Sequence, residues 1–175
     1  MRKNPVRELT MSAMLGAIYA VLTMVLPIPQ YAGVQIRLAE ALMVLPFLFP
    51  GSVPGLFVGC VISNLLSPYG LLDVIAGSGA TLLACLWTSR MKSWRLAFLP
   101  PVICNAVIVG AVIAFAQTGL GNAFVPAWVL NGLSVGLGEC IACGVLGTVM
   151  LKALPRLSAF RRMIPAQRLK LMPNA

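Results

Sequence analysis

Residues 37–88 read RLAEALMVLPFLFPGSVPGLFVGCVISNLLSPYGLLDVIAGSGATLLACLWT and are the most informative part of the chain. They contain three apolar runs separated by turn residues, at 38–49, 53–66 and 71–88. The first two runs have 12 and 14 residues, fewer than the roughly 17 to 25 that a membrane-spanning helix needs. They predict either two short membrane crossings or one re-entrant hairpin, and we favour two short crossings.

Longer apolar runs flank this stretch, at 9–26, 96–116 and 127–151. Of the 175 residues, 59% are hydrophobic and 10% charged, whereas a soluble domain carries roughly 25% charged residues. The mean hydropathy of +0.94 indicates that most of the chain is solvated by lipid. We therefore predict one all-α integral membrane domain over 1–175, a compact bundle of six transmembrane helices with the second and third short. The run at 9–26 also resembles a signal peptide, but it lacks a convincing cleavage site.

The basic residues predict how the bundle is oriented. Twelve of the thirteen lie in three clusters: Arg2, Lys3 and Arg7; Arg90, Lys92 and Arg95; and Lys152, Arg156, Arg161, Arg162, Arg168 and Lys170. The positive-inside rule then places the N-terminus (1–8), the central loop and the basic tail (152–175) in the cytoplasm. The same rule explains the net charge of +9 without a nucleic-acid partner.

The composition argues against an enzyme. The chain has no His, the commonest catalytic base and metal ligand near neutral pH, and only four acidic residues. Cys140 and Cys143 form a lone CxxC pair on an apolar run, without the further ligands that a zinc site needs. A Gly-rich phosphate loop with Lys is also absent from the sequence, so ATP hydrolysis would require another protein. We expect neither a metal nor a cofactor.

Ionisable residues inside the predicted helices are costly in lipid and are candidates for function. Glu139 is the clearest, because it lies about 18 Å along the last helix at 1.5 Å per residue, with no Lys or Arg at that depth. Arg37 and Glu40 share a helix face, which suits either an ion pair or a binding site. Asp73 begins the fourth helix, where a carboxylate also suits the helix dipole.

Together, these acids and nearby amides predict a polar ring that opens outward, formed by Glu40, Asn64, Asp73, Asn131 and Glu139. Trp128 and Tyr31 are candidates for a flat wall of this site, although aromatic residues also anchor helices at the membrane interface. We expect Asn105 to serve only as a hydrogen-bonding contact between helices. The ring suits a planar, donor-rich, cationic small molecule.

Small residues follow one side of the first helix, as Ser12, Gly16 and Ala20 and as Ala13 and Ala17. Small residues four apart allow helices to approach closely in lipid. The pattern is compatible with packing inside the bundle or against a partner.

Polar residues also recur in a fixed order along the apolar runs: RLAEAL at 37–42, LP at 45–46, PGLFVGC at 54–60, SN at 63–64 and GLLD at 70–73, with Gly77, Ala80 and Thr81. In these motifs the sequence resembles the QueT family, the substrate-binding S components of energy-coupling factor (ECF) importers for queuosine precursors. The resemblance implies a six-helix subunit of the bacterial cell membrane that binds a 7-deazaguanine, such as 7-aminomethyl-7-deazaguanine, from outside. The matching polar positions are Arg37, Glu40, Asn64 and Asp73.

The resemblance further implies a membrane coupling subunit and two ATPase subunits as partners. In S components small residues of the first helix contact the coupling subunit, which corresponds here to Ala13 and Ala17, and we include the neighbouring Ser12, Gly16 and Ala20. Other hypotheses stay open: an S component for another small vitamin or nucleobase, a self-sufficient multipass transporter, or a membrane enzyme acting on lipid head groups. The enzyme is disfavoured because its acids should cluster at the cytoplasmic face.

Overall fold

The computed structural model describes residues 5–25 and 37–172, and within these ranges the chain is helical without strands. The elements in order are α1 (Pro5–Val25), η1 (Leu38–Phe47), η2 (Pro50–Ser52), α2 (Val53–Asn64), η3 (Asp73–Gly77), α3 (Ser78–Arg90), η4 (Trp94–Leu96), α4 (Leu99–Thr118), α5 (Phe124–Glu139), η5 (Cys140–Gly147), α6 (Thr148–Ala153), η6 (Leu154–Arg156), α7 (Ser158–Arg161) and α8 (Ala166–Leu169). Most η elements are 3₁₀ helices, whereas η3 and η5 are π-helical segments.

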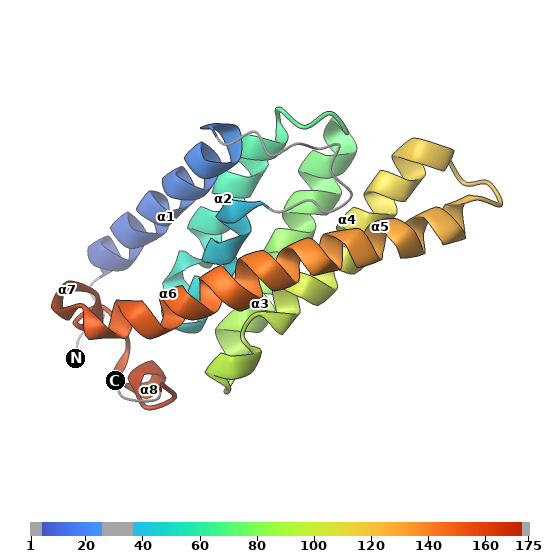
Figure 1. The fold of residues 1–175 in the computed structure, drawn as a ribbon. Helices are drawn as coiled ribbons and strands as arrows, with labels where there is room; N and C mark the ends of the chain where they lie inside the picture. The colour runs from blue at the N-terminus through green and yellow to red at the C-terminus, as the bar shows by residue number, and fades with distance from the viewer. Residues whose placement is uncertain (1–4, 26–36, 173–175) are drawn as a thin grey trace.

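The main elements form an all-α membrane bundle, as predicted (Figure 1). The segment η3 continues into α3, and α5 continues through η5 and α6, so each of the six predicted runs contains a helix. Three helices in the described ranges are long and apolar enough to cross a membrane: 5–25, 94–118 and 124–156. Exposed apolar side chains lie on the outward faces, including Val6, Leu9, Met14, Ile18 and Val21 on α1 and Val125, Val129, Leu133 and Leu137 on α5.

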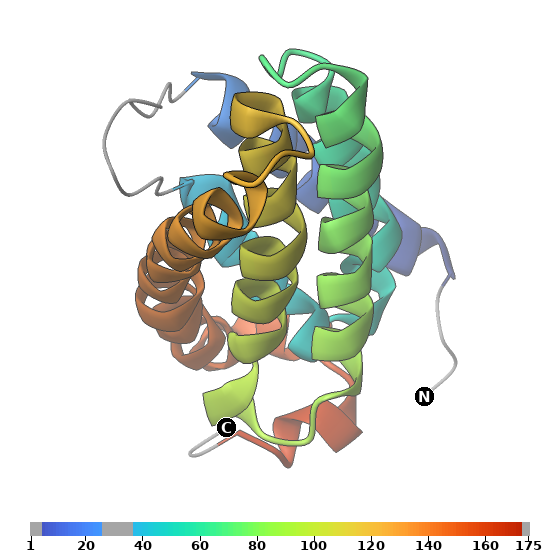
Figure 2. The same cartoon turned by 90° about the vertical axis from the view of Figure 1, so that its right-hand side faces the viewer.

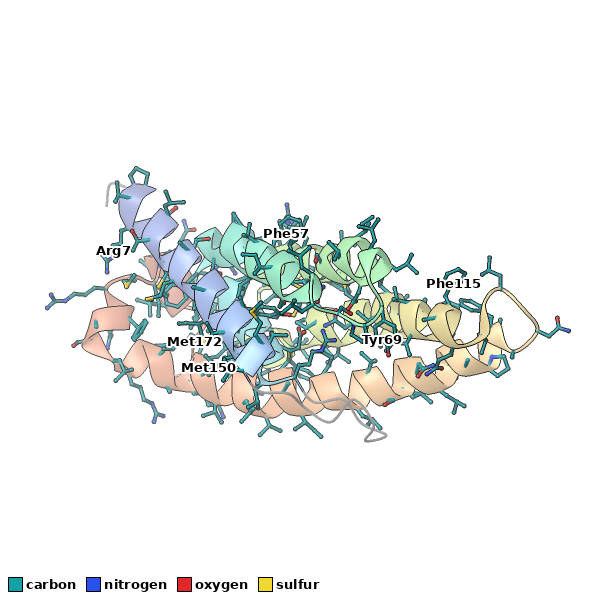
Figure 3. All side chains as sticks on the ribbon, turned by 90° about the horizontal axis from the view of Figure 1, so that it is seen from above. Arg7, Phe57, Tyr69, Phe115, Met150 and Met172 are labelled. Atoms are coloured by element: carbon teal, nitrogen blue, oxygen red, sulfur yellow. The ribbon has the colours of Figure 1, made fainter. Side chains whose placement is uncertain are left out.

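The two ends of the bundle differ in charge. The start of α1, the turn between α3 and α4 and the C-terminal segment lie together at one end, which we call the basic end (Figure 2). The α2–η3 turn (65–72) and the α4–α5 turn (119–123) lie at the other, the far end. Figure 3 shows the same separation, with Arg7 toward one end and Phe115 toward the other. The described parts of the three basic clusters therefore gather at one end, which is the arrangement that a common location in the cytoplasm requires.

The short helix η1 forms the centre of the bundle. All of its residues except Leu38 are buried, and Met43, Val44 and Phe47 are 0% exposed. A 3₁₀ helix rises about 2.0 Å per residue, so its ten residues extend only about 20 Å, less than the hydrocarbon thickness of about 30 Å. The second and third helices are therefore short, as predicted, and η1 packs within the protein instead of facing lipid.

Helices α1 and α2 pack through small residues with their backbones in contact. A Cβ added to Gly55 would collide with the Ser12 backbone, and one added to Gly16 would collide with the Gly55 carbonyl. The Gly55 amide donates a hydrogen bond of 2.9 Å to Ser12 Oγ. Ser12, Gly16 and Ala20, which were predicted to dock a partner, are buried, and Ser12 and Gly16 pack against α2; their role in docking stays a prediction.

The C-terminal segment closes the basic end. Ile164 and Met172 are buried in the same core cluster as Phe47, and Met150 packs against that cluster; Figure 3 labels both methionines. The Arg168 guanidinium donates hydrogen bonds to the carbonyls of Met91, at 2.8 Å, and Ser89. It also lies over the Phe47 ring, 5.5 Å from the centroid. The tail is thus packed onto the ends of α3 and η1.

Candidate functional site

A polar cavity lies between η1, α2, η3, α3, α4 and α5, toward the far end of the bundle. It is lined by Arg37, Glu40, Cys60, Asn64, Asp73, Gly77, Thr81, Asn105, Val109, Val135 and Glu139. Its volume is about 410 Å³ with its open mouth included, of which about 20 Å³ admits the centre of a water-sized sphere. The enclosed part of the cavity is therefore large enough for about one water molecule.

The helices depart from regular geometry where they build this cavity. Asp73 and Gly77 are the first and last residues of the π-helical segment η3, and Glu139 immediately precedes the second such segment, η5. Single π-helical turns within α-helices occur often at functional sites. Glycine at position 77 leaves room for two polar side chains of the cavity, because an added Cβ would displace the Asp73 carboxylate and lie 3.1 Å from Asn64 Nδ2.

Two buried carboxyl groups meet at Asn105 in the inner part of the cavity. The Asn105 side-chain nitrogen donates to Glu139 Oε1 at 2.5 Å and to Glu40 Oε2 at 3.5 Å. The exposed fractions are 5% for Glu40, 6% for Glu139 and 3% for Asn105. One amide from α4 therefore joins carboxyl groups that come from η1 and α5.

Further donors hold these carboxyl groups in place. The Tyr19 hydroxyl donates to Glu40 Oε1 at 2.8 Å. The Cys143 thiol lies one helical turn beyond Glu139, and its single hydrogen can be donated either to Glu139 Oε2, at 3.3 Å, or to the Glu40 carbonyl, at 3.1 Å. Both supporting residues are buried. Each carboxylate oxygen has two lone pairs, so capacity remains for a ligand's donors.

A second polar cluster lies nearer the far end. The Asn64 side-chain nitrogen donates to the Asp73 carbonyl at 3.1 Å and to Ser78 Oγ at 3.2 Å. The Ser67 hydroxyl donates to Asp73 Oδ2 at 2.6 Å. Asp73 is 1% exposed, so its carboxylate is a buried component of the site.

Arg37 lies at the mouth of this arrangement, just before η1, and lines the cavity. Across residues 5–25 and 37–172 its guanidinium makes neither a hydrogen bond nor an ion pair, so of the two roles considered for Arg37 and Glu40 the ion pair is not formed there. The other unused group is an acceptor, since Asn105 Oδ1 is buried without a hydrogen-bond partner. The cavity thus contains one unpaired donor group and one unpaired acceptor.

The structure brings together five of the seven residues predicted for the substrate site: Arg37, Glu40, Asn64, Asp73 and Glu139. Trp128 and Asn131 lie elsewhere, in contact with α4. The Trp128 indole donates to the Val107 carbonyl at 2.9 Å, and the Asn131 amide donates to Gln117 Oε1 at 2.8 Å. These two side chains connect α4 and α5, so the predicted ring is correct only in part. Tyr31 lies outside the described residues.

Sequence reasoning missed Tyr19 and gave Asn105 only a structural role. Asn105 carries a detectable signal, because a carboxamide inside an apolar run is costly by the same argument that singled out Glu139. Tyr19 carries none, since a tyrosine in a membrane helix more often anchors the helix at the interface. Its contact with Glu40 depends on how α1 packs against η1.

Chemically, the cavity suits recognition of a polar, positively charged molecule. Its lining supplies three carboxyl groups, two carboxamides and a single guanidinium. Within the described ranges no three or more His, Cys, Asp or Glu side chains are arranged to hold a metal ion. Hydrogen bonding and charge are therefore the means by which these residues can hold a ligand.

Comparison with known proteins gives one match. A family model described as QueT transporter matches residues 9–156, which include every residue of the cavity lining. No curated protein and no solved structure matches the chain. The C-terminal segment with Arg168 lies beyond the matched residues.

Proposed function

The chain belongs to the QueT transporter family, and we propose that it is the substrate-binding S component of an ECF importer for a 7-deazaguanine queuosine precursor. The observation that carries this proposal is the cavity lined by Arg37, Glu40, Asn64, Asp73 and Glu139. These residues are buried or half-buried in a bundle whose outward faces are apolar. Polar groups that are retained at such a cost are expected to serve a ligand.

The chemistry of a 7-deazaguanine matches the cavity lining. Its guanine-like edge carries N–H donors that suit a carboxylate such as Asp73, and its carbonyl oxygen suits the guanidinium of Arg37. The aminomethyl group of 7-aminomethyl-7-deazaguanine is a cation and requires a second acidic group. The enclosed part of the cavity has room for about one water molecule, which is too small for a bicyclic ligand. We therefore expect ligand binding to widen the cavity by moving the surrounding helices.

Import through this proposed complex depends on ATPase subunits and on a membrane coupling subunit. The docking residues that we propose are Ala13 and Ala17, which are exposed beside Met14 and Ile18 on α1. They lie one helical turn apart on an exposed side of α1, each about 100° around the helix from a residue that contacts α2, Ser12 or Gly16. A partner helix can approach closely there because the side chains are small.

We also propose that the basic end faces the cytoplasm, which places the cavity in the outer half of the membrane. The test is thiol labelling of intact cells with a membrane-impermeant reagent, comparing Ser93→Cys with Asn122→Cys and with the parent protein for background from Cys140. Ser93 lies in the turn between α3 and α4, and Asn122 lies in the turn between α4 and α5. Labelling of Asn122→Cys alone supports the orientation, and labelling of Ser93→Cys alone reverses it.

The substrate assignment is tested on gently purified protein. Mass spectrometry identifies any co-purified ligand, and calorimetry then measures the affinity for 7-aminomethyl-7-deazaguanine, with guanine and thiamine as comparison ligands. Tight binding of the deazaguanine alone supports the proposal, whereas preference for another vitamin or nucleobase reassigns the substrate. Uptake by proteoliposomes that contain this chain without ATPases would instead identify a self-sufficient transporter.

A further inference from the structure

Asn105 presents an unusual hydrogen-bonding arrangement in the inner part of the cavity. Its side-chain nitrogen faces the carboxyl groups of Glu139 and Glu40, and its Oδ1 is buried without a partner. When both carboxyl groups are ionised, the opposite orientation of the amide would place its oxygen against two carboxylates, where acceptor would meet acceptor. The neighbouring carboxyl groups therefore fix the direction of the amide, and the oxygen is the group left over.

The carboxyl groups that contact the Asn105 side chain are acceptors. Donors from the protein are already committed there, since Tyr19 bonds Glu40 and the Cys143 thiol lies against Glu139. The remaining capacity consists of Asn105 Oδ1 and the free lone pairs of the two carboxyl groups. A buried acceptor without a donor costs free energy, so its retention indicates that a donor arrives from outside the chain.

The balance of charge points to the same kind of ligand. The cavity lining contains Glu40, Asp73 and Glu139 but a single cation, Arg37. A ligand that brings a positive charge offsets part of this imbalance, whereas a neutral one does not. A primary ammonium also carries three N–H donors, which equals the number of acceptor groups that Glu40, Asn105 and Glu139 contribute to the cavity lining.

We propose that Asn105 is a specificity-determining residue, whose Oδ1 binds the ligand's primary ammonium group together with the carboxyl groups of Glu40 and Glu139. This inference rests on the proposed function and makes it more specific. The site selects a 7-deazaguanine that carries an ammonium group over one of the same ring system that carries a neutral substituent. The bicyclic ring is then left for the second polar cluster, around Asn64 and Asp73.

The test uses calorimetry on the purified full chain to compare the affinities for two ligands, 7-aminomethyl-7-deazaguanine and 7-cyano-7-deazaguanine. These ligands differ only at the 7-substituent. Sites built to hydrogen-bond a substrate group reject analogues without it strongly, so we expect the wild type to prefer the aminomethyl ligand by at least about 100-fold. Leu has the same branched skeleton as Asn but no polar atoms. In Asn105→Leu the preference should therefore fall below about tenfold, mostly through weaker binding of the aminomethyl ligand. Asn131→Leu is the matched control and should retain the full preference, because Asn131 bonds Gln117 outside the cavity.

The outcomes separate the two proposals. A wild type that binds neither deazaguanine refutes the proposed function and this inference with it. A wild type that binds both ligands equally refutes the inference alone. A folded Asn105→Leu protein that keeps the full preference assigns the ammonium group to other residues and also overturns the inference. If Asn105→Leu does not fold, Asn105→Ser replaces it, with circular dichroism as the check, and the same loss of preference is required.

Discussion

Two half-buried arginines, Arg168 and Arg37, lie near opposite ends of η1 and differ in the hydrogen bonds that they make. At the basic end, Arg168 donates to the Met91 and Ser89 carbonyls and lies over the ring of Phe47, the last residue of η1. At the other end, Arg37 precedes the first residue of η1, lines the cavity and makes no such bond in the described part of the chain. Within the described residues the fold therefore uses the hydrogen-bonding capacity of Arg168 and not that of Arg37, and we propose that a ligand uses the latter.

The same contrast separates the α1–α2 contact from the cavity. Where α1 meets α2, glycines bring the backbones together and leave no space for a Cβ. Around the cavity, polar side chains leave a space of about 20 Å³ and an acceptor without a donor. Complete packing indicates a structural role, and unfilled space with unpaired polar groups indicates binding. The predictions below test this distinction in order of expected effect.

The largest effect is expected from Gly55→Ala, because even one methyl group would collide with the Ser12 backbone. Overpacking of this kind should cost about 3 kcal/mol or more, enough to prevent recovery of folded protein or to lower its unfolding temperature markedly. The matched control is Gly79→Ala in α3, where an added Cβ meets nothing within 4 Å. Thermal unfolding in detergent compares the two variants, and equal stability would disprove the close contact.

The next largest effect concerns uptake. Replacing Ala13 and Ala17 together by Leu should lower uptake about tenfold or more in cells that contain the coupling subunit and ATPases, since bulk there separates the partner helix. Ligand affinity of the purified variant should be unchanged, because both side chains are exposed and lie outside the cavity lining. Val25→Phe adds bulk at an exposed position of α1 that lies about 12 Å along the axis and about 80° around the helix from Ala17, and it serves as the control. Normal uptake by the double variant would exclude this docking surface.

In the cavity, Glu139→Gln should weaken binding of 7-aminomethyl-7-deazaguanine by about tenfold or more, equivalent to about 1.4 kcal/mol. Gln has nearly the same shape and can still accept from Asn105, so the helices should remain packed while one buried carboxyl group is lost. Calorimetry measures the affinity, and thermal unfolding confirms the fold. Normal binding by a folded variant would assign Glu139 a structural role.

The sequence was sufficient to predict the six helical runs and five residues of the cavity lining. Hydropathy locates helices, and the cost of charge in lipid identifies Glu40, Asp73 and Glu139. The rotation of α5 was harder to predict. On a regular helix Asn131 is about 80° around from Glu139, and Trp128 shares the face of Glu139 but lies about 16 Å along the axis. Neither reaches the cavity, and a stricter use of helix geometry would have removed both.

Other features depend on packing that no local pattern encodes. The stripe of small residues on α1 has two edges, and the sequence does not show which edge meets α2 and which stays exposed. The contacts of Tyr19 with Glu40 and of Arg168 with Met91 join residues 21 and 77 positions apart. Only the three-dimensional arrangement reveals that one of these contacts supports the cavity and the other closes the basic end.

The smallest expected effects come from the two arginines, and they should be opposite in kind. Arg168→Met removes the hydrogen bonds to the Met91 and Ser89 carbonyls while retaining an apolar side chain over Phe47. We expect a stability loss of about 1 kcal/mol, since the group is only half buried, with ligand affinity unchanged. Arg168→Lys should recover part of the loss, because an ammonium cannot reproduce the planar guanidinium fork.

Arg37→Met should show the reverse: the stability should be unchanged, and the ligand affinity should fall by about three- to fivefold, or roughly 1 kcal/mol. The reason is that the Arg37 guanidinium lines the cavity without a hydrogen bond to the described residues. Thermal unfolding and calorimetry on both variants give four measurements for one comparison. If Arg37→Met destabilises the protein as much as Arg168→Met does, then Arg37 has structural contacts and is not reserved for a ligand. If instead Arg168→Met weakens binding without loss of stability, η1 transmits the state of the basic end to the cavity, and the two ends are not independent.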